Sequence, residues 1–426
     1  MILERLQKRL FFLLAFLISA QIGYHFWPPF TYVTGVRVDY LSPTVYLLDI
    51  LIVLWVLLAL YRSSFKLNWE IKSPLVRSVF LLFIFDVVIN IFLSKSQLAH
   101  VWGLFKLFEM GLFGFLVSIY FKKDWISWFV RSLAASSIIS GTLAMWQFVV
   151  QGSIGGLWYY LGERNFTTDT IGISMVDFGR EYLRAYAAFP HPNVLAFFAL
   201  MTFVFVARYI KQEKEILWRI IMLLSCFFCM ATLGVTFSRI TIFMFVVFVG
   251  TLIFEVISRN ARNFTLGFLQ VILPAVMLFS GFMYPGFIFR GIDTRQELLQ
   301  QSYQIFLKNP YIGIGLNNFF INQAPFIKTI SPINFQPVHN IFVLALLSLG
   351  VFGWWIFPAM LIEAIRSVLR KIKKSKGISE VREFYKSTLF LLISVVVIGM
   401  FDHFFLTLEQ GEIMLAVILG LAFANL

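Results

Sequence analysis

The chain has 426 residues, of which 59% are hydrophobic and 13% charged, and 51 of them are phenylalanine. Apolar runs long enough to cross a bilayer recur to its end, so the composition excludes a soluble globular domain and predicts an integral membrane protein. The net charge of +13 does not indicate nucleic-acid binding, because the basic residues gather in alternate connections between the apolar runs.

Twelve transmembrane helices are predicted, each near the ~20 residues that a bilayer requires. Residues 1–150 hold five, over 10–27, 44–61, 75–93, 98–121 and 125–150. Residues 191–284 hold four, over 191–209, 216–234, 238–257 and 264–284, and residues 339–426 hold three, over 339–365, 386–406 and 409–425. Long connections over 151–190 and 285–338 separate these groups. The predicted fold class is therefore an all-α integral membrane protein with about 12 transmembrane helices.

Positive charge orients these helices. Basic residues lie in the first ten residues and in the connections near 62–77, 122–123, 208–219, 259–262 and 366–386. These are every second connection, so the positive-inside rule places them, and both termini, in the cytoplasm. The connections over 151–190 and 285–338 are then external loops. Long ordered loops of this kind are usually functional.

The second external loop contains a predicted amphipathic helix. Thr294 and Glu297 form a capping box, and Asn309-Pro310 ends the helical pattern. The apolar face between them consists of Leu298, Leu299, Tyr303, Phe306 and Leu307. Such a helix is expected on the outer membrane surface, with Arg295 in its first turn.

Polar residues gather at the predicted external ends of the helices. They are Arg184 with His191, Ser238 with Arg239, His339 with Asn340, and Asp402 with His403 and Glu409. Charge placed at a cost in a membrane protein usually marks a functional site. The plainer interpretations are a snorkelling anchor for Arg239, a solvated loop charge for Arg295 and an interfacial or capping residue for His339.

Other polar residues have structural interpretations. His191 and His403 are interpreted as structural rather than catalytic, although Asp402 and His403 are candidates for contact with substrate. Lys106 and Glu109, three residues apart within the helix over 98–121, are interpreted as a buried ion pair rather than a polar lining.

The candidate residues suit an anionic ligand. A diphosphate requires fixed positive charge and paired donors, which arginine supplies better than lysine, and helix N-termini add free N–H groups. No D-x-D or His/Glu metal spacing occurs on the external face, so neither a metal nor another cofactor is predicted. His339 near a helix N-terminus is expected to be neutral and able to accept a proton from a hydroxyl group.

Five motifs, in this order over about residues 180–426, resemble the O-antigen ligase and polymerase superfamily. They are RAYAAFPHPN at 184–193, TFSR at 236–239, DTR…KNPYIGIGLNNF at 293–319, HN with LGVFG at 349–353, and DHFFLTLEQG at 402–411. By position, the ligase histidine matches His339, the two essential arginines match Arg239 and Arg295, and a further arginine matches Arg184. The chain departs from the family pattern in carrying alanine, at 187 or 188, where a glycine is usual.

The resemblance implies a metal-independent, inverting glycosyltransferase of the bacterial inner membrane that assembles surface polysaccharide such as O-antigen for lipopolysaccharide. Its donor would be a glycan on undecaprenyl diphosphate at the external face, and its acceptor a glycan, a lipid or a protein. Catalytic roles would fall on His339, Arg239 and Arg295. Arg184, Asn340, Asp402 and His403 would bind substrate, while Asn340 could instead orient His339 or cap its helix.

Three other functions stay open. A transporter or flippase of lipid-linked saccharides would place polar residues near the bilayer midplane, where only Asp49, Asp86, Lys106 and Glu109 are expected. A protein O-oligosaccharyltransferase would differ in its acceptor alone. A peptidoglycan polymerase of the shape-and-division type fits the order of the motifs less well. Membrane lipids are expected partners in each case, and nucleic acid in none.

Overall fold

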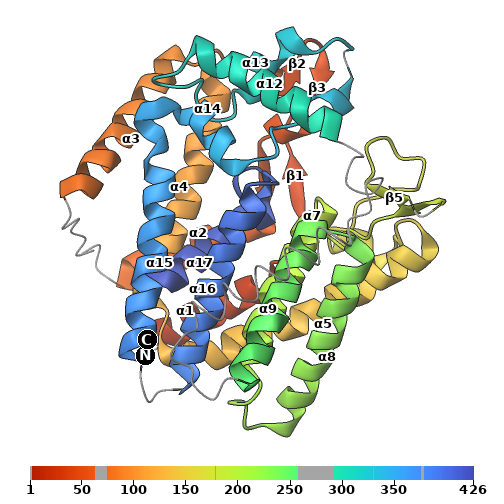
Figure 1. Ribbon diagram of the computed structural model, residues 1–426, viewed down its shortest axis with the longest axis vertical. Helices are drawn as coiled ribbons and strands as arrows, with labels where there is room; N and C mark the ends of the chain where they lie inside the picture. Colours follow the sequence, from red (N-terminus) through yellow and green to blue (C-terminus); the bar gives the residue numbers. More distant parts are fainter. Residues whose placement is uncertain (1, 63–73, 178, 258–291, 330, 376–378) are drawn as a thin grey trace.

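The computed structural model describes residues 2–62, 74–177, 179–257, 292–329, 331–375 and 379–426, and over them the fold is mostly helical (Figure 1). The α-helices of the first half are α1 (Ile2–Leu17), α2 (Leu47–Arg62), α3 (Pro74–Leu93), α4 (Gln97–Tyr120), α5 (Ile126–Val150), α6 (Leu157–Tyr160), α7 (Pro192–Tyr209), α8 (Ile216–Thr236) and α9 (Arg239–Ile257). Those of the second half are α12 (Ile292–Lys308), α13 (Phe319–Gln323), α14 (Ile341–Trp354), α15 (Ile356–Lys374), α16 (Ser379–Gly399) and α17 (Glu409–Phe423). The predicted helical class is confirmed. The predicted helix over 264–284, with Arg259 and Arg262, lies outside the described residues.

Four helices of the described part are long and apolar enough to cross a membrane, and one bent pair gives a fifth. They are Gln97–Tyr120, Lys123–Val150, Pro192–Tyr209, Ile216–Thr236, and the pair Ile341–Trp354 and Ile356–Lys374. The first four lie within two residues of the predicted ranges 98–121, 125–150, 191–209 and 216–234. Several long apolar helices indicate a multi-pass membrane protein. The structure does not show the full predicted number of about 12.

The predicted helix over 10–27 is wrong at its end. α1 stops at Leu17, and Gly23–His25 (β1) pairs with Thr44–Tyr46 (β4) in a small antiparallel sheet. A second hairpin joins Tyr32–Val33 (β2) to Val36–Arg37 (β3). Gly23 lies against the ring of Tyr46, where a Cβ atom would approach the ring carbons to 2.5 Å. Residues 18–46 therefore contain no α-helix, and two short 3-10 helices, η1 (Pro29–Thr31) and η2 (Asp39–Leu41), lie between their strands.

The predicted single helix over 339–365 is two helices. α14 and α15 meet at 87°, and Gly350, at φ 58°, also interrupts α14. The chain that follows α12 fills the interruption by pairing with the α14 backbone on both sides of Gly350. The bonds run from Ile314 N to Leu347 O (2.9 Å), Gly315 N to Ser348 O (3.0 Å), Val351 N to Pro310 O (2.9 Å) and Phe352 N to Tyr311 O (3.1 Å). Backbone groups freed by the interruption thus keep partners.

Replacing Gly350 by alanine should destabilise the protein. The new methyl group would overlap backbone atoms of Tyr311 and Gly313, and alanine is strained at a positive φ. We expect a loss of about 1–3 kcal/mol, seen as a lower melting temperature of the purified protein in detergent. Gly111→Ala in α4 is the matched control, because its methyl group meets no atom within 4 Å and its melting temperature should not fall. Equal melting temperatures for the two variants would contradict this account of the bend.

The amphipathic helix of the second long loop is confirmed as α12, which ends at Lys308 directly before Asn309-Pro310. It begins at Ile292, so Thr294 lies inside the helix and is not its N-cap. The buried face consists of Leu298, Ser302 and Ile305. Of the predicted apolar face, Leu299, Tyr303 and Leu307 are about half exposed, at 47%, 59% and 53%.

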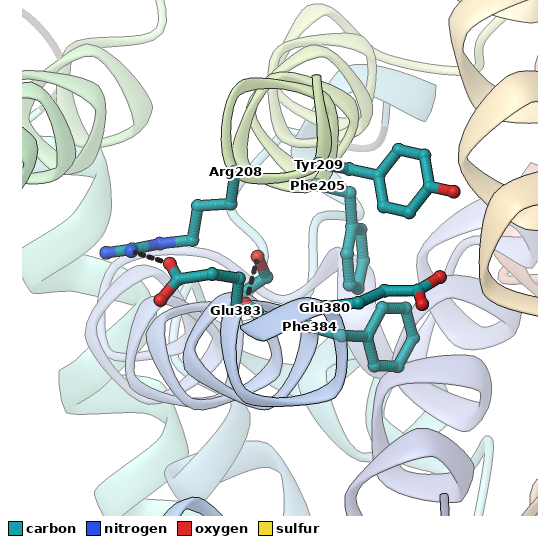
Figure 2. A pocket seen from close by; sticks show the side chains of 7 residues that line it. Phe205, Arg208, Tyr209, Glu380, Glu383 and Phe384 are labelled. Carbon is teal, nitrogen blue, oxygen red and sulfur yellow. Dashed lines mark hydrogen bonds and ion pairs between the residues drawn. The ribbon is translucent and has the colours of Figure 1, made fainter. Parts of the chain in front are cut away.

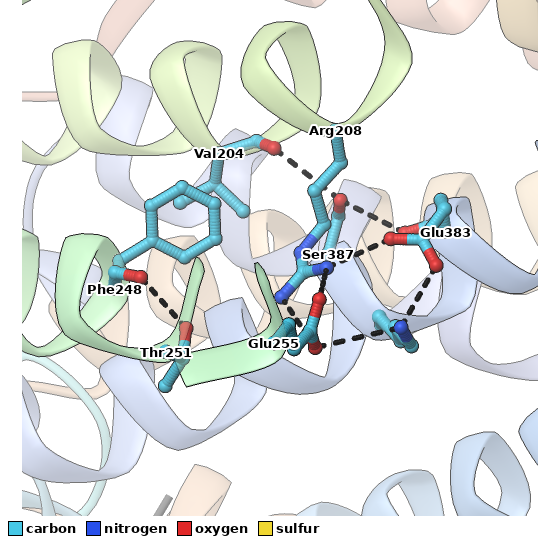
Figure 3. Close-up of polar contacts among 8 residues, drawn as sticks. Val204, Arg208, Phe248, Thr251, Glu255, Glu383 and Ser387 are labelled. Carbon is cyan, nitrogen blue, oxygen red and sulfur yellow. Dashed lines mark hydrogen bonds and ion pairs between the residues drawn. The ribbon is translucent and has the colours of Figure 1, made fainter. Parts of the chain in front are cut away.

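Ion pairs join helices at the end of the molecule that carries both chain termini. This is the lower end in the view of Figure 1. Lys8 contacts Asp124 at 2.5 Å and Lys122 contacts Glu4 at 2.8 Å, joining α1 to the connection between α4 and α5. Arg208, at the end of α7, binds Glu255 and Glu383 at 3.0 and 2.7 Å (Figure 3). Among the described residues, the basic N-terminal segment thus meets the connection at 122–123, and Arg208 meets Glu383 of the connection near 366–386.

The space beside Arg208 is not a candidate substrate pocket. Figure 2 shows the side chains of Phe205, Tyr209, Glu383 and Phe384 around it, and the space between them is too narrow for a water molecule. Arg208 and Glu383 at its edge are paired with each other.

Candidate functional site

Two predicted site residues meet far from the chain termini. His339 lies two residues before the start of α14, and His403 lies between α16 and the short 3-10 helix η7 (Phe404–Leu406). Their imidazole rings pack edge to face, with centroids 5.1 Å apart. The carboxylate of Asp402, which is 4% exposed, accepts a hydrogen bond from the backbone N–H of His403 at 2.7 Å. The prediction that these residues belong to one region therefore has geometric support.

Asn193 connects Asp402 to Arg184. Its side-chain amide donates to Asp402 Oδ2 at 2.5 Å, and its Oδ1 accepts from the Arg184 guanidinium at 2.6 Å. Arg184 Nε donates to the carbonyl of Thr236, the last residue of α8, at 2.7 Å. Arg184 is thus fixed beside the turn that leads to Arg239. Sequence reasoning did not select Asn193, although it stands in the RAYAAFPHPN motif.

The three predicted arginines share one electrostatic environment. Arg239 is the first residue of α9, and Arg295 lies in the first turn of α12 with an exposed side chain. Burial lowers the pKa of Arg184 to about 10, and the positive charges of Arg239 and Arg295 contribute to this shift. Arg295 also acts on His339 and His403. Electrostatic effects therefore link the three arginines to one another, and Asn193 links Arg184 to Asp402.

His339 has the properties of a neutral base. Burial lowers its pKa, the charge of Arg295 lowers it further, and Asp402 and the Pro337 carbonyl oppose these effects. Its Nδ1 atom is buried, and no group of the described chain gives it a hydrogen bond of good geometry. A neutral imidazole with an unused ring nitrogen can accept a proton.

Asn340 caps α14. Its Oδ1 accepts from the N–H groups of Phe342 and Val343 at 2.9 and 3.1 Å, and its Nδ2 donates to the Met400 carbonyl at 3.1 Å. This is an N-cap arrangement, and it ties the backbone beside His339 to the end of α16. The capping alternative is therefore confirmed, and Asn340 fixes the position of His339.

His191 is partly buried, His403 is buried, and both are neutral. His191 Nδ1 accepts from Asn193 N at 3.1 Å as the N-cap of α7, and His403 Nδ1 pairs with the Thr407 hydroxyl at 2.7 Å. Burial lowers the pKa of each to about 3, although Asp402 acts in the opposite direction. Burial raises the pKa of Asp402, but the three histidines and Asn193 outweigh it, so this carboxyl group has a lowered pKa and is ionised.

The two histidines should therefore make the folded protein less stable in acid. Between pH about 6.5 and 3 an unfolded chain binds protons at His191 and His403 that the folded chain does not, so these two residues lower stability as pH decreases. Their expected contribution is roughly 1.4 kcal/mol per pH unit for each histidine. The difference in melting temperature between the wild type and the double variant His191→Asn/His403→Gln, in detergent at pH 7.5, 6.0 and 5.0, measures it. The wild type should lose more stability than the double variant as pH decreases, and equal pH slopes for the two proteins would contradict the assignment of two neutral histidines.

Tyr40 is a further residue of this site that sequence reasoning missed. Its ring stacks on Phe320 of α13, with centroids 5.4 Å apart, and meets the edge of His403 at 5.6 Å. Burial raises the pKa of its phenol, and Asp402 adds to the effect. Tyr40 lies in the short 3-10 helix η2 (Asp39–Leu41), and nothing in its local sequence indicates that it approaches a histidine about 360 residues later.

The geometry defines a polar site at helix ends of a mostly helical protein with several long apolar helices. No protein-family model matches the chain, and no curated protein is significantly similar to it.

Proposed function

We propose that the protein is a membrane glycosyltransferase of bacterial surface polysaccharide assembly, of the O-antigen ligase or polymerase type. It would take a glycan from undecaprenyl diphosphate at the external face of the inner membrane and transfer it, with inversion and without a metal, to a hydroxyl group. In this proposal the chain crosses the membrane about twelve times and both termini are cytoplasmic. The acceptor can be a glycan, a lipid or a protein.

The observation that carries the proposal is the partly buried, neutral imidazole of His339, on which Arg295 acts, together with the electrostatic link of Arg295 to Arg239 and Arg184. A diphosphate leaving group gains negative charge as its bond to the sugar breaks, and fixed guanidinium groups stabilise that charge. Arg239 and Arg295 would hold the diphosphate, with Arg184 behind them held by Asn193 and Thr236. Asp402 would keep the neighbouring region from carrying too much positive charge.

The proposed reaction needs one proton acceptor. His339 accepts the proton of the acceptor hydroxyl as its oxygen attacks the anomeric carbon from the face opposite the diphosphate. The carbon–oxygen bond to the diphosphate breaks, and its electron pair stays with the leaving phosphate. The proton on His339 then passes to water or to the departing diphosphate, which restores the neutral base.

The α12 helix supports a membrane-surface location for this reaction. Leu299, Tyr303 and Leu307 are spaced four residues apart and lie exposed on one side of α12, and Arg295 is four residues before Leu299. An apolar stripe next to a positive charge suits a helix at the boundary between lipid tails and headgroups. The diphosphate of a polyprenyl lipid lies at this depth.

A flippase or transporter of lipid-linked saccharides is the second candidate. The observation that favours it is the buried group of ionisable residues around Lys106, because such groups within membrane helices often belong to transport pathways.

Purified protein in detergent distinguishes the two functions. The proposed enzyme, given a polyprenyl-diphosphate glycan with a labelled glycan and a hydroxyl acceptor, should release free polyprenyl diphosphate without any gradient. A transporter would leave the donor intact in detergent and move it across the bilayer of proteoliposomes. That second result would overturn the proposed function.

A further inference from the structure

Lys106 lies at the centre of a buried group that the proposed reaction does not use. Its ammonium contacts Asp49 Oδ1 at 2.6 Å, Glu109 Oε2 at 2.9 Å and Glu409 Oε2 at 2.9 Å. These residues come from α2, α4 and α17, and we call the four of them the lysine cluster. The expected Lys106–Glu109 ion pair is confirmed, and the fold adds two carboxyl groups that lie far away in sequence.

The lysine cluster carries more carboxyl groups than it can hold as anions. The side chains of Lys106, Asp49, Glu109 and Glu409 are only 12%, 11%, 5% and 4% exposed. Three carboxylates and one ammonium would leave two uncompensated negative charges within packed helices. Uncompensated charge is strongly unfavourable there, so the cluster needs two further positive charges.

Two carboxyl oxygens of the lysine cluster indicate which ligand supplies the two missing positive charges. Glu109 Oε1 and Glu409 Oε1 are buried, and neither accepts a hydrogen bond from the described part of the chain. Both carboxyl groups contact the same Lys106 ammonium as the Asp49 carboxyl, at 2.6–2.9 Å, so the three groups lie close together. Asp49 Oδ2 already accepts from the Tyr46 N–H at 2.8 Å. Carboxyl groups in contact with one another are stable when one of each pair is protonated.

We propose that the lysine cluster is a proton-binding site that holds two protons at neutral pH, one on Glu109 and one on Glu409. Each proton comes from water and turns a carboxylate into a donor toward Asp49. The remaining Asp49 carboxylate and Lys106 ammonium then balance, and the group is neutral. The described residues contain no arrangement of three or more acidic, histidine or cysteine side chains suited to a metal ion, which favours protons as the ligand.

Two more titratable groups act on the cluster. Tyr46, directly before α2, feels the charges of Glu409 and Asp49, and Glu412, one turn after Glu409 in α17, acts on Lys106. The cluster joins the first turn of α17 to α4, and α17 also packs on η7, which directly follows His403. The bound protons therefore help to hold the turn that carries Asp402 and His403.

Infrared spectroscopy tests the proposal without any enzyme assay. Protein with carboxyl-labelled glutamate should show a protonated carboxyl band at pH 7, and the variant Glu109→Gln/Glu409→Gln should lose it. Glu363→Gln is the matched control, because Glu363 pairs with Arg370 at the surface and should leave the band unchanged. A wild type without the band, or a double variant that keeps it, would overturn the proposal.

Stability gives a second measurement. Because the folded chain holds two protons that an unfolded chain releases, the wild type should lose stability as pH rises from 7 to 9, whereas the double variant should lose less. If the double variant does not fold, Glu409→Gln alone should remove about half of the infrared band. A melting temperature that instead rises with sodium, at constant ionic strength, would show a cation in place of the protons and contradict the proposal.

Discussion

His339→Gln should lower glycan transfer by at least about 100-fold while the protein stays folded in the membrane. General base catalysis contributes about 100- to 10,000-fold, and glutamine keeps a polar side chain of similar size but accepts no proton. The reason lies in the site: His339 is neutral, its Nδ1 has no good partner, and Arg295 holds its pKa down. Transfer from a labelled polyprenyl-diphosphate donor measures the loss.

His25→Gln is the matched control for this variant. His25 lies in the same segment as Tyr40, between α1 and α2, is exposed, and pairs with the Thr44 hydroxyl at 2.7 Å. Its replacement should leave the transfer rate within about twofold, since it has no contact with the reacting groups. Wild-type activity in His339→Gln, with equal membrane yield of both variants, would remove His339 from the proposed mechanism.

Arg239→Lys and Arg295→Lys should each lower kcat/KM by about 100- to 1,000-fold. Lysine keeps the charge but cannot place two parallel N–H donors on a phosphate. Removing one donor from an anion that develops in the transition state lowers the rate by a factor of this size. Because the contact strengthens as the diphosphate leaves, the loss should fall mainly on kcat. Transfer rates over a range of donor concentrations separate kcat from KM.

Arg180→Lys is the control for the arginine variants. Arg180 is exposed between the two short strands β5 (Met175–Asp177) and β6 (Glu181–Leu183), and its guanidinium lies 4.5 Å from the Tyr182 ring. It should behave as the wild type. If both lysine variants at 239 and 295 retain full kcat/KM, the two arginines act as membrane anchors and not as diphosphate ligands.

The long apolar helices could be predicted because their sequence limits are local. α4, α5, α7 and α8 each fill an apolar run that charged residues or a turn interrupts at both ends, so composition alone gives their ends within two residues. The apolar run over 10–27 does not form one helix, because its second half makes tertiary contacts. Its second half pairs with residues 44–46, and the proline pair at 28–29 cannot continue a helix.

The bend after α14 depends on a distant segment. LGVFG reads as part of one apolar helix, and only the pairing of residues 310–315 with both sides of Gly350 makes two helices favourable. The motifs KNPYIGIGLNNF and LGVFG are therefore parts of one structural unit. No local pattern in either shows this.

The connections within the candidate site could not be predicted. Charge alternation and unusual placement selected Arg184, Arg239, Arg295, His339, Asp402 and His403 as candidate site residues. The structure joins Arg184 to Asp402 through Asn193, packs His339 against His403, and brings Tyr40 to His403. These contacts depend on how α7, α16 and residues 18–46 pack.

Photocrosslinking tests the central claim most directly. A polyprenyl diphosphate that carries a photoreactive group on its first isoprene unit is bound to the purified protein, illuminated, and located by peptide mass spectrometry. The label should fall on peptides that contain Arg239, Arg295 or His339, at the helix ends that form the candidate site. A label confined to the opposite end, on the peptides around Arg208 and Glu383, would contradict the account.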